Sequence, residues 1–243
     1  MMNPDKKSFR GVFPVIQTPY GDDGSIEYDV LNEEIDWVFR HGVDGLTIAL
    51  ASEILRLTDA ERCELGARTV EICNGRGPVV VSVGGESLAQ VQHFARVAED
   101  SGASAVMAIP PLSVRCSESE LHKYFECILR EVSVPLVIQD ASAYLGVPLS
   151  IHFQCEISKE FGDRILFKPE ADPVGPVIAA LQNTESKNTG IFEGNGGLDL
   201  VNNFKQGCTG SMPACDIPWA IVPLWRNLEV GNFEAAEKIQ KPL

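Results

Sequence analysis

One lysine of this chain stands where an amine could act as a nucleophile. Lys168 ends the apolar run Ile165-Leu166-Phe167, which has the composition of a buried β-strand. An amine at the end of such a strand projects at the mouth of a low-dielectric core, where burial disfavours the ammonium form. The neutral amine is the form that attacks a carbonyl carbon to give a Schiff base. The structural alternative is a lysine that pairs with Glu170 or extends to water.

Acidic residues follow several of the other apolar runs. Five of them stand at or just beyond a predicted strand end and could together bind Mg²⁺ or Mn²⁺, namely Glu53, Glu86, Asp140, Glu170 and Glu193. The four histidines lie in helix-like segments and lack the H-x-x-x-H spacing of a zinc site. We therefore predict no metal site, and we keep metal-dependent chemistry as an alternative.

Two glycine-rich stretches also follow predicted strands, Gly84-Gly85 and Gly194-Asn195-Gly196-Gly197. Glycine allows the backbone to approach a ligand closely and to direct its N–H groups at an anion, such as the carboxylate of an oxo acid. Ordinary tight turns between a strand and a helix would require the same residues. Both interpretations stay open on this pattern.

The elements that must position these residues are short β-rich runs that alternate with helix-like segments. The helical spacing of apolar residues predicts helices at Leu31–His41, Asp59–Cys73, Leu88–Ser101, Ser119–Val132 and Ile151–Phe161. The predicted strands are Val12–Thr18, Gly45–Leu50, Pro78–Val83, Ala105–Pro110, Pro135–Asp140, Ile165–Pro169, Gly190–Gly194 and Gly210–Pro213. This alternation predicts an α/β fold, a (β/α)8 TIM barrel formed as one domain by residues 1–243. A doubly wound sheet is the rival, but no G-x-G-x-x-G loop follows the first strand.

Composition restricts the partners of this chain. With 20 Lys and Arg against 34 Asp and Glu, the net charge is −14, which disfavours binding to nucleic acid and to anionic membrane surfaces. We find no signal-peptide pattern and no membrane-spanning run. The seven cysteines lack C-x-x-C spacing, so we expect reduced, packed thiols. These features predict a cytoplasmic protein.

The order of motifs along the chain resembles the dihydrodipicolinate synthase / N-acetylneuraminate lyase superfamily over nearly its whole length. The likeness is carried by Gly11-Val12-Phe13-Pro14, Thr18-Pro19-Tyr20, Asp22-Asp23-Gly24-Ser25-Ile26, Gly42-Val43-Asp44-Gly45, Glu53 with Leu57-Thr58-Asp59-Ala60-Glu61-Arg62, Pro110-Pro111, Pro135 with Gly146, and Gly207 with Gly210. The family's Schiff-base lysine falls on Lys168. The resemblance implies a barrel with class I aldolase or dehydratase chemistry on pyruvate-like 2-oxo acids, and no cofactor.

The chain departs from the family pattern where substrate and proton are handled. Ala49-Leu50-Ala51-Ser52-Glu53 stands where the family has a Gly-Thr-Thr-Gly-Glu type motif, so two hydroxyls are missing. Gln139 replaces the tyrosine at the end of the fifth strand, and an amide cannot give and take a proton near neutral pH. Leu112-Ser113 replaces the tyrosine pair after Pro110-Pro111. Tyr144 either supplies the missing phenol or is an ordinary loop residue.

The end of the chain is a second departure. The family's barrel is normally followed by several further helices, whereas here only about residues 226–243 could begin such a C-terminal extension, which is largely missing. Those helices commonly contribute to packing and assembly in the family. We expect a homo-oligomer if the shortened chain is stable.

The sequence thus predicts a class I lyase, in which Lys168 forms an imine with a small-molecule 2-oxo acid. The reaction would be aldol cleavage or condensation, or dehydration of a 2-keto-3-deoxy sugar acid. Gln139 and Tyr144 would orient the substrate or relay protons, and Glu53 would brace its loop. The residues expected to hold the substrate carboxylate are Ser52, Ala51, Gly194 and Asn195. The alternatives are a divalent-metal-dependent lyase and a catalytically impaired barrel that binds 2-oxo acids.

Overall fold

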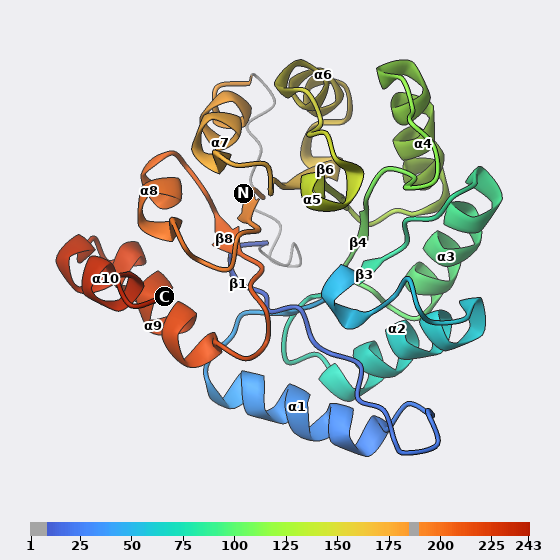
Figure 1. The fold of residues 1–243 in the computed structure, drawn as a ribbon, viewed down its shortest axis with the longest axis horizontal. Helices are drawn as coiled ribbons and strands as arrows, with labels where there is room; N and C mark the ends of the chain where they lie inside the picture. The colour runs from blue at the N-terminus through green and yellow to red at the C-terminus, as the bar shows by residue number, and fades with distance from the viewer. Residues whose placement is uncertain (1–8, 185–189) are drawn as a thin grey trace, which may run out of the picture.

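Parallel strands form a closed ring in the computed structural model, which describes residues 9–184 and 190–243. The strands are β1 (Gly11–Val12), β2 (Leu46–Ile48), β3 (Val79–Ser82), β4 (Ala105–Ala108), β5 (Leu136–Gln139), β6 (Ile165–Lys168), β7 (Phe192–Glu193) and β8 (Gly210–Ser211). Strands β2 to β6 pair in sequence order, and β8 lies between β7 and β1. Bridges from Val15 to Thr47 and from Phe167 to Ile191 join the two groups into one barrel (Figure 1). The predicted α/β barrel is confirmed.

Helices surround this ring (Figure 1). Their apolar faces pack against the outer side of the strands. Their bounds are α1 (Tyr28–Arg40), α2 (Asp59–Cys73), α3 (Leu88–Asp100), α4 (Glu118–Glu131), α5 (Ser142–Leu145), α6 (Ile151–Phe161), α7 (Val174–Gln182), α8 (Leu200–Lys205), α9 (Pro218–Glu229) and α10 (Phe233–Gln240). Thr58 and Ser117 begin α2 and α4 with capping boxes, in which each side chain accepts from the third helical N–H. Gly42, Gly75 and Gly102 follow α1, α2 and α3 with positive φ, a conformation that commonly ends a helix.

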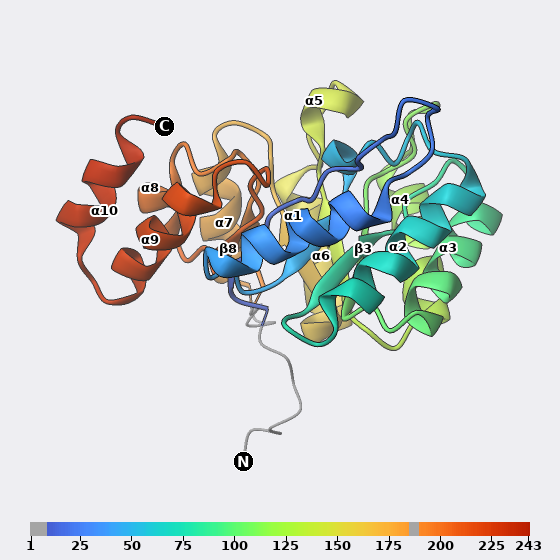
Figure 2. The same cartoon turned by 90° about the horizontal axis from the view of Figure 1, so that it is seen from below.

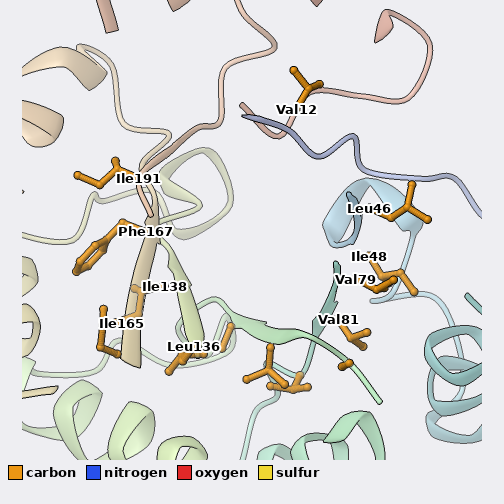
Figure 3. Packing of buried hydrophobic residues seen from close by; sticks show 14 of the residues in the cluster. Val12, Leu46, Ile48, Val79, Val81, Leu136, Ile138, Ile165, Phe167 and Ile191 are labelled. Carbon is orange, nitrogen blue, oxygen red and sulfur yellow. The ribbon is translucent and has the colours of Figure 1, made fainter. Parts of the chain in front are cut away.

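Side chains alternate along each strand between two cores. Val12, Leu46, Ile138 and Phe167 belong to the core between strands and helices, and Figure 3 shows these side chains directed away from the barrel axis. The residues next to them fill the barrel interior, and they include Phe13, Val137, Leu166, Phe192 and Met212. Because Leu166 points inward, the residue two positions later on β6, Lys168, also faces the interior, at its open end.

Three details differ from the sequence prediction. The first and seventh strands are shorter than predicted, since β1 keeps only Gly11–Val12 and β7 only Phe192–Glu193. The predicted second strand stops at Ile48, and Leu50–Ser52 form a 3-10 turn instead. The short helix α5 was not predicted, and Figure 2 shows it standing out from the rest of the barrel. Within the described residues no helix is long and apolar enough to span a bilayer.

Candidate active site at the barrel mouth

A small pocket lies at the carboxyl ends of the strands, which is where (β/α)8 barrels carry out chemistry. Its volume is about 150 Å³, small for a ligand site. It brings together five residues that the sequence predicted for the site, Gln139, Tyr144, Lys168, Ala51 and Gly194. The rest of the lining consists of Val15, Ala49, Leu50, Glu170, Met212 and Ala214.

Lys168 is held at this pocket by a carboxylate. Its side chain is 5% exposed, and its Nζ lies 3.0 Å from Oε1 of Glu170, whose side chain is 15% exposed. The same oxygen accepts a hydrogen bond from Nε2 of Gln139 at 2.8 Å. One carboxylate oxygen therefore contacts both the amine and the amide, so Glu170 can receive a proton from Lys168 without leaving its place.

Two neighbouring strands determine where Glu170 lies. Asp140, one residue after β5, accepts hydrogen bonds from the backbone N–H groups of Glu170 at 3.0 Å and Ala171 at 3.2 Å. On the β7 side, a Cβ added at Gly194 would lie 2.5 Å from Cγ of Glu170, so only glycine leaves room for this side chain. The position of the Glu170 carboxylate is thus fixed by the hydrogen bonds of its backbone to Asp140 and by its close packing against Gly194.

Glu193 organises the glycine-rich turn after β7. It is fully buried, and its carboxylate accepts from the N–H groups of Asn195 at 2.7 Å and Gly197 at 3.0 Å and from the Ser211 hydroxyl at 2.8 Å. Burial raises the pKa of Glu193, although these hydrogen bonds and the charge of Lys168 oppose the rise. Asn195 does not line the pocket, and its N–H is engaged by Glu193. Of the two residues predicted in this turn, only Gly194 reaches the pocket.

The β2 side of the mouth supplies backbone and apolar surface. Ser52 is fully buried, and its hydroxyl donates to the Ile16 carbonyl at 2.5 Å and accepts from the Ala49 N–H at 3.2 Å. This geometry corrects the expectation that the Ser52 hydroxyl is free for a substrate carboxylate, because both bonds stay within the protein. Glu53 adopts a left-handed conformation and pairs with Arg56 at 2.9 Å, outside the pocket.

Tyr144 approaches the pocket from α5. Its side chain lines the pocket and is 58% exposed, in contrast to the buried Gln139 and Lys168. A left-handed Ala141 precedes this helix and a left-handed Gly146 follows it. The phenol is therefore present at the edge of the site, with open solvent on one side.

The strand-end carboxylates are used individually rather than as a group. Glu86, for example, accepts from the backbone N–H groups of Leu112 and Ser113, both at 2.9 Å, and so fixes the loop after β4. Among residues 9–184 and 190–243, no three His, Cys, Asp or Glu side chains are grouped so that they could hold a metal ion. The chemistry that this mouth offers is therefore that of an amine beside a carboxylate.

Comparisons with known proteins show the family of this chain. A profile of the dihydrodipicolinate synthetase family matches residues 8–243, and the chain belongs to this family. An L-2-keto-3-deoxyarabonate dehydratase of Azospirillum brasilense is 29% identical over 93% of this chain and 75% of its own length. A 4-hydroxy-tetrahydrodipicolinate synthase of Methanococcus maripaludis is 27% identical over 96% of this chain and 80% of its own length.

Solved structures show the same barrel. The dihydrodipicolinate synthase of Aquifex aeolicus superimposes with a TM-score of 0.90 at 21% identity, over 97% of this chain and 80% of that one. A prophage protein of Escherichia coli K12, solved in complex with pyruvate, also gives 0.90 at 22% identity, with coverages of 96% and 80%. With its homologues named as synthases, aldolases and dehydratases, the chain is a lyase of this family.

Glu170 was not predicted as a residue of the active site. The sequence indicated only that it could pair with Lys168 or be one of several carboxylates at strand ends. The available signal was its spacing, since Lys168 and Glu170 flank a single proline at the end of β6. Its shared contact with Gln139 could not be read from the sequence, because that contact joins residues 31 positions apart.

Proposed function

We propose that this protein dehydrates a short 2-keto-3-deoxy sugar acid through a Schiff base on Lys168, with Glu170 as the proton carrier. The observation that carries the proposal is the contact of 3.0 Å between Nζ of Lys168 and Oε1 of Glu170, whose side chains are only 5% and 15% exposed. A buried amine beside a carboxylate can lose its proton locally and then attack the keto carbon. The backbone around Ala51 and Gly194 would hold the substrate carboxylate.

The proposed steps balance as follows. Glu170 takes a proton from the ammonium group, the neutral amine adds to the C2 carbonyl carbon, and Glu170 returns the proton to the departing hydroxyl, which leaves as water. The resulting iminium draws electrons from C3, and Glu170 removes a C3 proton to form an enamine. The enamine expels the C4 hydroxyl as a second water, with the proton from Glu170. Hydrolysis of the conjugated imine consumes one water and frees an unsaturated 2-oxo acid.

Dehydration and aldol cleavage require different proton transfers at the C4 hydroxyl. Aldol cleavage requires a base there, and Gln139 in place of the family's tyrosine cannot serve as one, so Glu170 would have to take that role as well. Dehydration requires a group that first accepts a proton and then donates it, which a carboxylate near the amine can do. The dehydratase of Azospirillum brasilense among the relatives supports dehydration.

Product analysis with a trapping control tests this proposal. The protein is incubated with 2-keto-3-deoxypentonate, and the products are separated by mass. Dehydration gives an acid lighter by one water, whereas aldol cleavage gives pyruvate. In parallel, borohydride with pyruvate should add the mass of a reduced adduct to the native chain and not to Lys168→Ala. A folded native chain that forms no adduct with pyruvate or longer 2-oxo acids contradicts the proposal.

A further inference from the structure

Asp140 contacts the chain on both sides of the reactive pair. Its backbone N–H donates to the Lys168 carbonyl at 3.3 Å, while its carboxylate accepts from the N–H groups of Glu170 at 3.0 Å and Ala171 at 3.2 Å. The Asp140 side chain does not line the pocket and is 1% exposed. It therefore holds the segment that contains Lys168 and Glu170 without touching the space for substrate.

We propose that Asp140 is a positioning residue, which keeps the Glu170 carboxylate within proton-transfer distance of Lys168. This inference rests on the proposed function. Glu170 lies after β6, beyond the last ladder contact, which joins Gln139 and Lys168. Its N–H donates to Asp140 and its carboxylate accepts from Gln139, so the last residue of β5 and the residue after it fix both ends of Glu170.

Small displacements matter for a proton carrier. A misplacement of about 1 Å in an active site can cost roughly 100-fold in rate. Without the Asp140 carboxylate, the Glu170 N–H would lose its acceptor, and the loop after β6 could move away from the amine. Imine formation would slow as well, because Glu170 also carries the proton in that step, but the yield of imine on Lys168 after long incubation would be kept.

Glu193 provides a matched comparison within the same barrel. Like Asp140, it is a buried carboxylate at the end of a strand that accepts from backbone N–H groups. Glu193 accepts from two of them and Asp140 from three, the third being that of Ser142 at 3.4 Å. The Glu193 partners Asn195 and Gly197 belong to the turn after β7 and not to the Glu170 loop. Removal of the Glu193 carboxylate should therefore displace the Gly194 backbone, weaken substrate binding and raise KM. Removal of the Asp140 carboxylate should instead lower kcat.

A double-mutant cycle with 2-keto-3-deoxypentonate tests the inference. Asp140→Ala, which leaves the Glu170 N–H without its acceptor, should lower kcat by about 10- to 100-fold in the native background, in line with a displaced proton carrier. In a Glu170→Gln background the same change should lower the residual kcat by less than about threefold, because residues that act as one unit are not additive. Glu193→Gln should raise KM by similar factors in both backgrounds.

Several outcomes overturn the positioning role. An unchanged kcat in Asp140→Ala overturns it, and so does an equal fall in both backgrounds, which indicates a general structural role. Thermal unfolding is measured for each variant, and Asp140→Ser is used if Asp140→Ala does not fold. If neither Asp140 variant folds, Asp140 is required for overall stability, and the positioning role is overturned as well. Absence of a borohydride adduct in the native chain would instead contradict the proposed function, independently of Asp140.

Discussion

The two halves of the barrel mouth contribute different things to the pocket. Strands β5 to β7 bring the polar groups Gln139, Lys168 and Glu170, which contact one another at 2.8 and 3.0 Å. The opposite half, from β8 through β1 to β2, lines the same pocket with apolar side chains such as Val15, Ala49 and Met212. In the proposed mechanism, the first half performs the chemistry and the other shapes the space around it.

The buried hydroxyl of Ser52 illustrates the same division. On the β2 side, this hydroxyl forms hydrogen bonds with the backbone of Ile16 and Ala49, so a polar side chain stabilises the fold there. On the other half, the carboxylates of Asp140 and Glu193 hold loops, while that of Glu170 faces the amine. Residue type alone does not separate these roles, but the direction of each side chain does.

The largest effect is expected at Glu170. Glu170→Gln keeps the size of the side chain but removes the proton carrier, so dehydration should slow by about 100- to 10,000-fold, the usual contribution of general acid–base catalysis. The borohydride adduct on Lys168 should form more slowly, because Glu170 also carries the proton in imine formation, but it should reach the native yield after long incubation. Steady-state kinetics and intact mass measure the two effects. Glu53→Gln is the matched control, since Glu53 pairs with Arg56 outside the pocket, and its kcat should stay near the native value.

Gln139→Leu should have the next largest effect. It removes the hydrogen bond to Glu170 while it keeps a side chain of similar volume. A hydrogen bond to a charged group contributes about 1.5–3 kcal/mol, so kcat should fall by roughly 10- to 150-fold. A kcat unchanged within twofold would show that Gln139 does not position Glu170, and the contrast between the two halves would weaken.

Tyr144→Phe should affect turnover less. The phenol stands at the exposed edge of the pocket, so its removal should lower kcat by less than about tenfold, with Glu170 as the main acid–base group. Kinetics with the same substrate measure the change. A fall of more than about 100-fold would assign the proton relay to Tyr144 and would move the chemistry toward α5.

The smallest effect on chemistry is expected at Ser52. Ser52→Ala leaves the Ile16 carbonyl without its donor and the Ala49 N–H without its acceptor, which should cost about 1–3 kcal/mol of stability. For a chain of this length, each kcal/mol lowers the thermal midpoint by roughly 2–4 °C. Calorimetry measures the shift, and kcat should stay within a few fold. A large loss of kcat without a change in the thermal midpoint would show that the β8–β2 half of the barrel mouth also takes part in the chemistry.

The sequence predicted the elements better than the contacts between them. The bounds of α2 and α6 agree with the predicted helices, because their apolar spacing and caps lie within one continuous segment. Lys168 could be identified as a candidate for the same reason, because the apolar run that it ends is also one continuous segment. Strands β1 and β7 were predicted too long, since apolar residues beside short strands also pack in the barrel interior.

The site partners of Lys168 were harder to predict. Ser52 and Asn195 were expected to meet the substrate, but their local sequence does not reveal that Ile16 and Glu193 already bind them. Glu170 was visible in the sequence, and its role depends on Gln139 and Asp140, which come from another strand. Contacts of this kind are fixed by the closure of the barrel and leave no periodic pattern.

Exchange of the pyruvate methyl protons in D₂O tests the central claim most directly. Pyruvate that forms an imine on Lys168 should exchange its C3 protons with solvent when Glu170 removes and returns them, and proton NMR follows the loss of the methyl signal. We expect rapid exchange with the native chain, none with Lys168→Ala, and exchange slowed about 100-fold or more in Glu170→Gln, which still traps the adduct after long incubation. Native exchange rates in a folded Glu170→Gln would contradict the claim that Glu170 carries the proton.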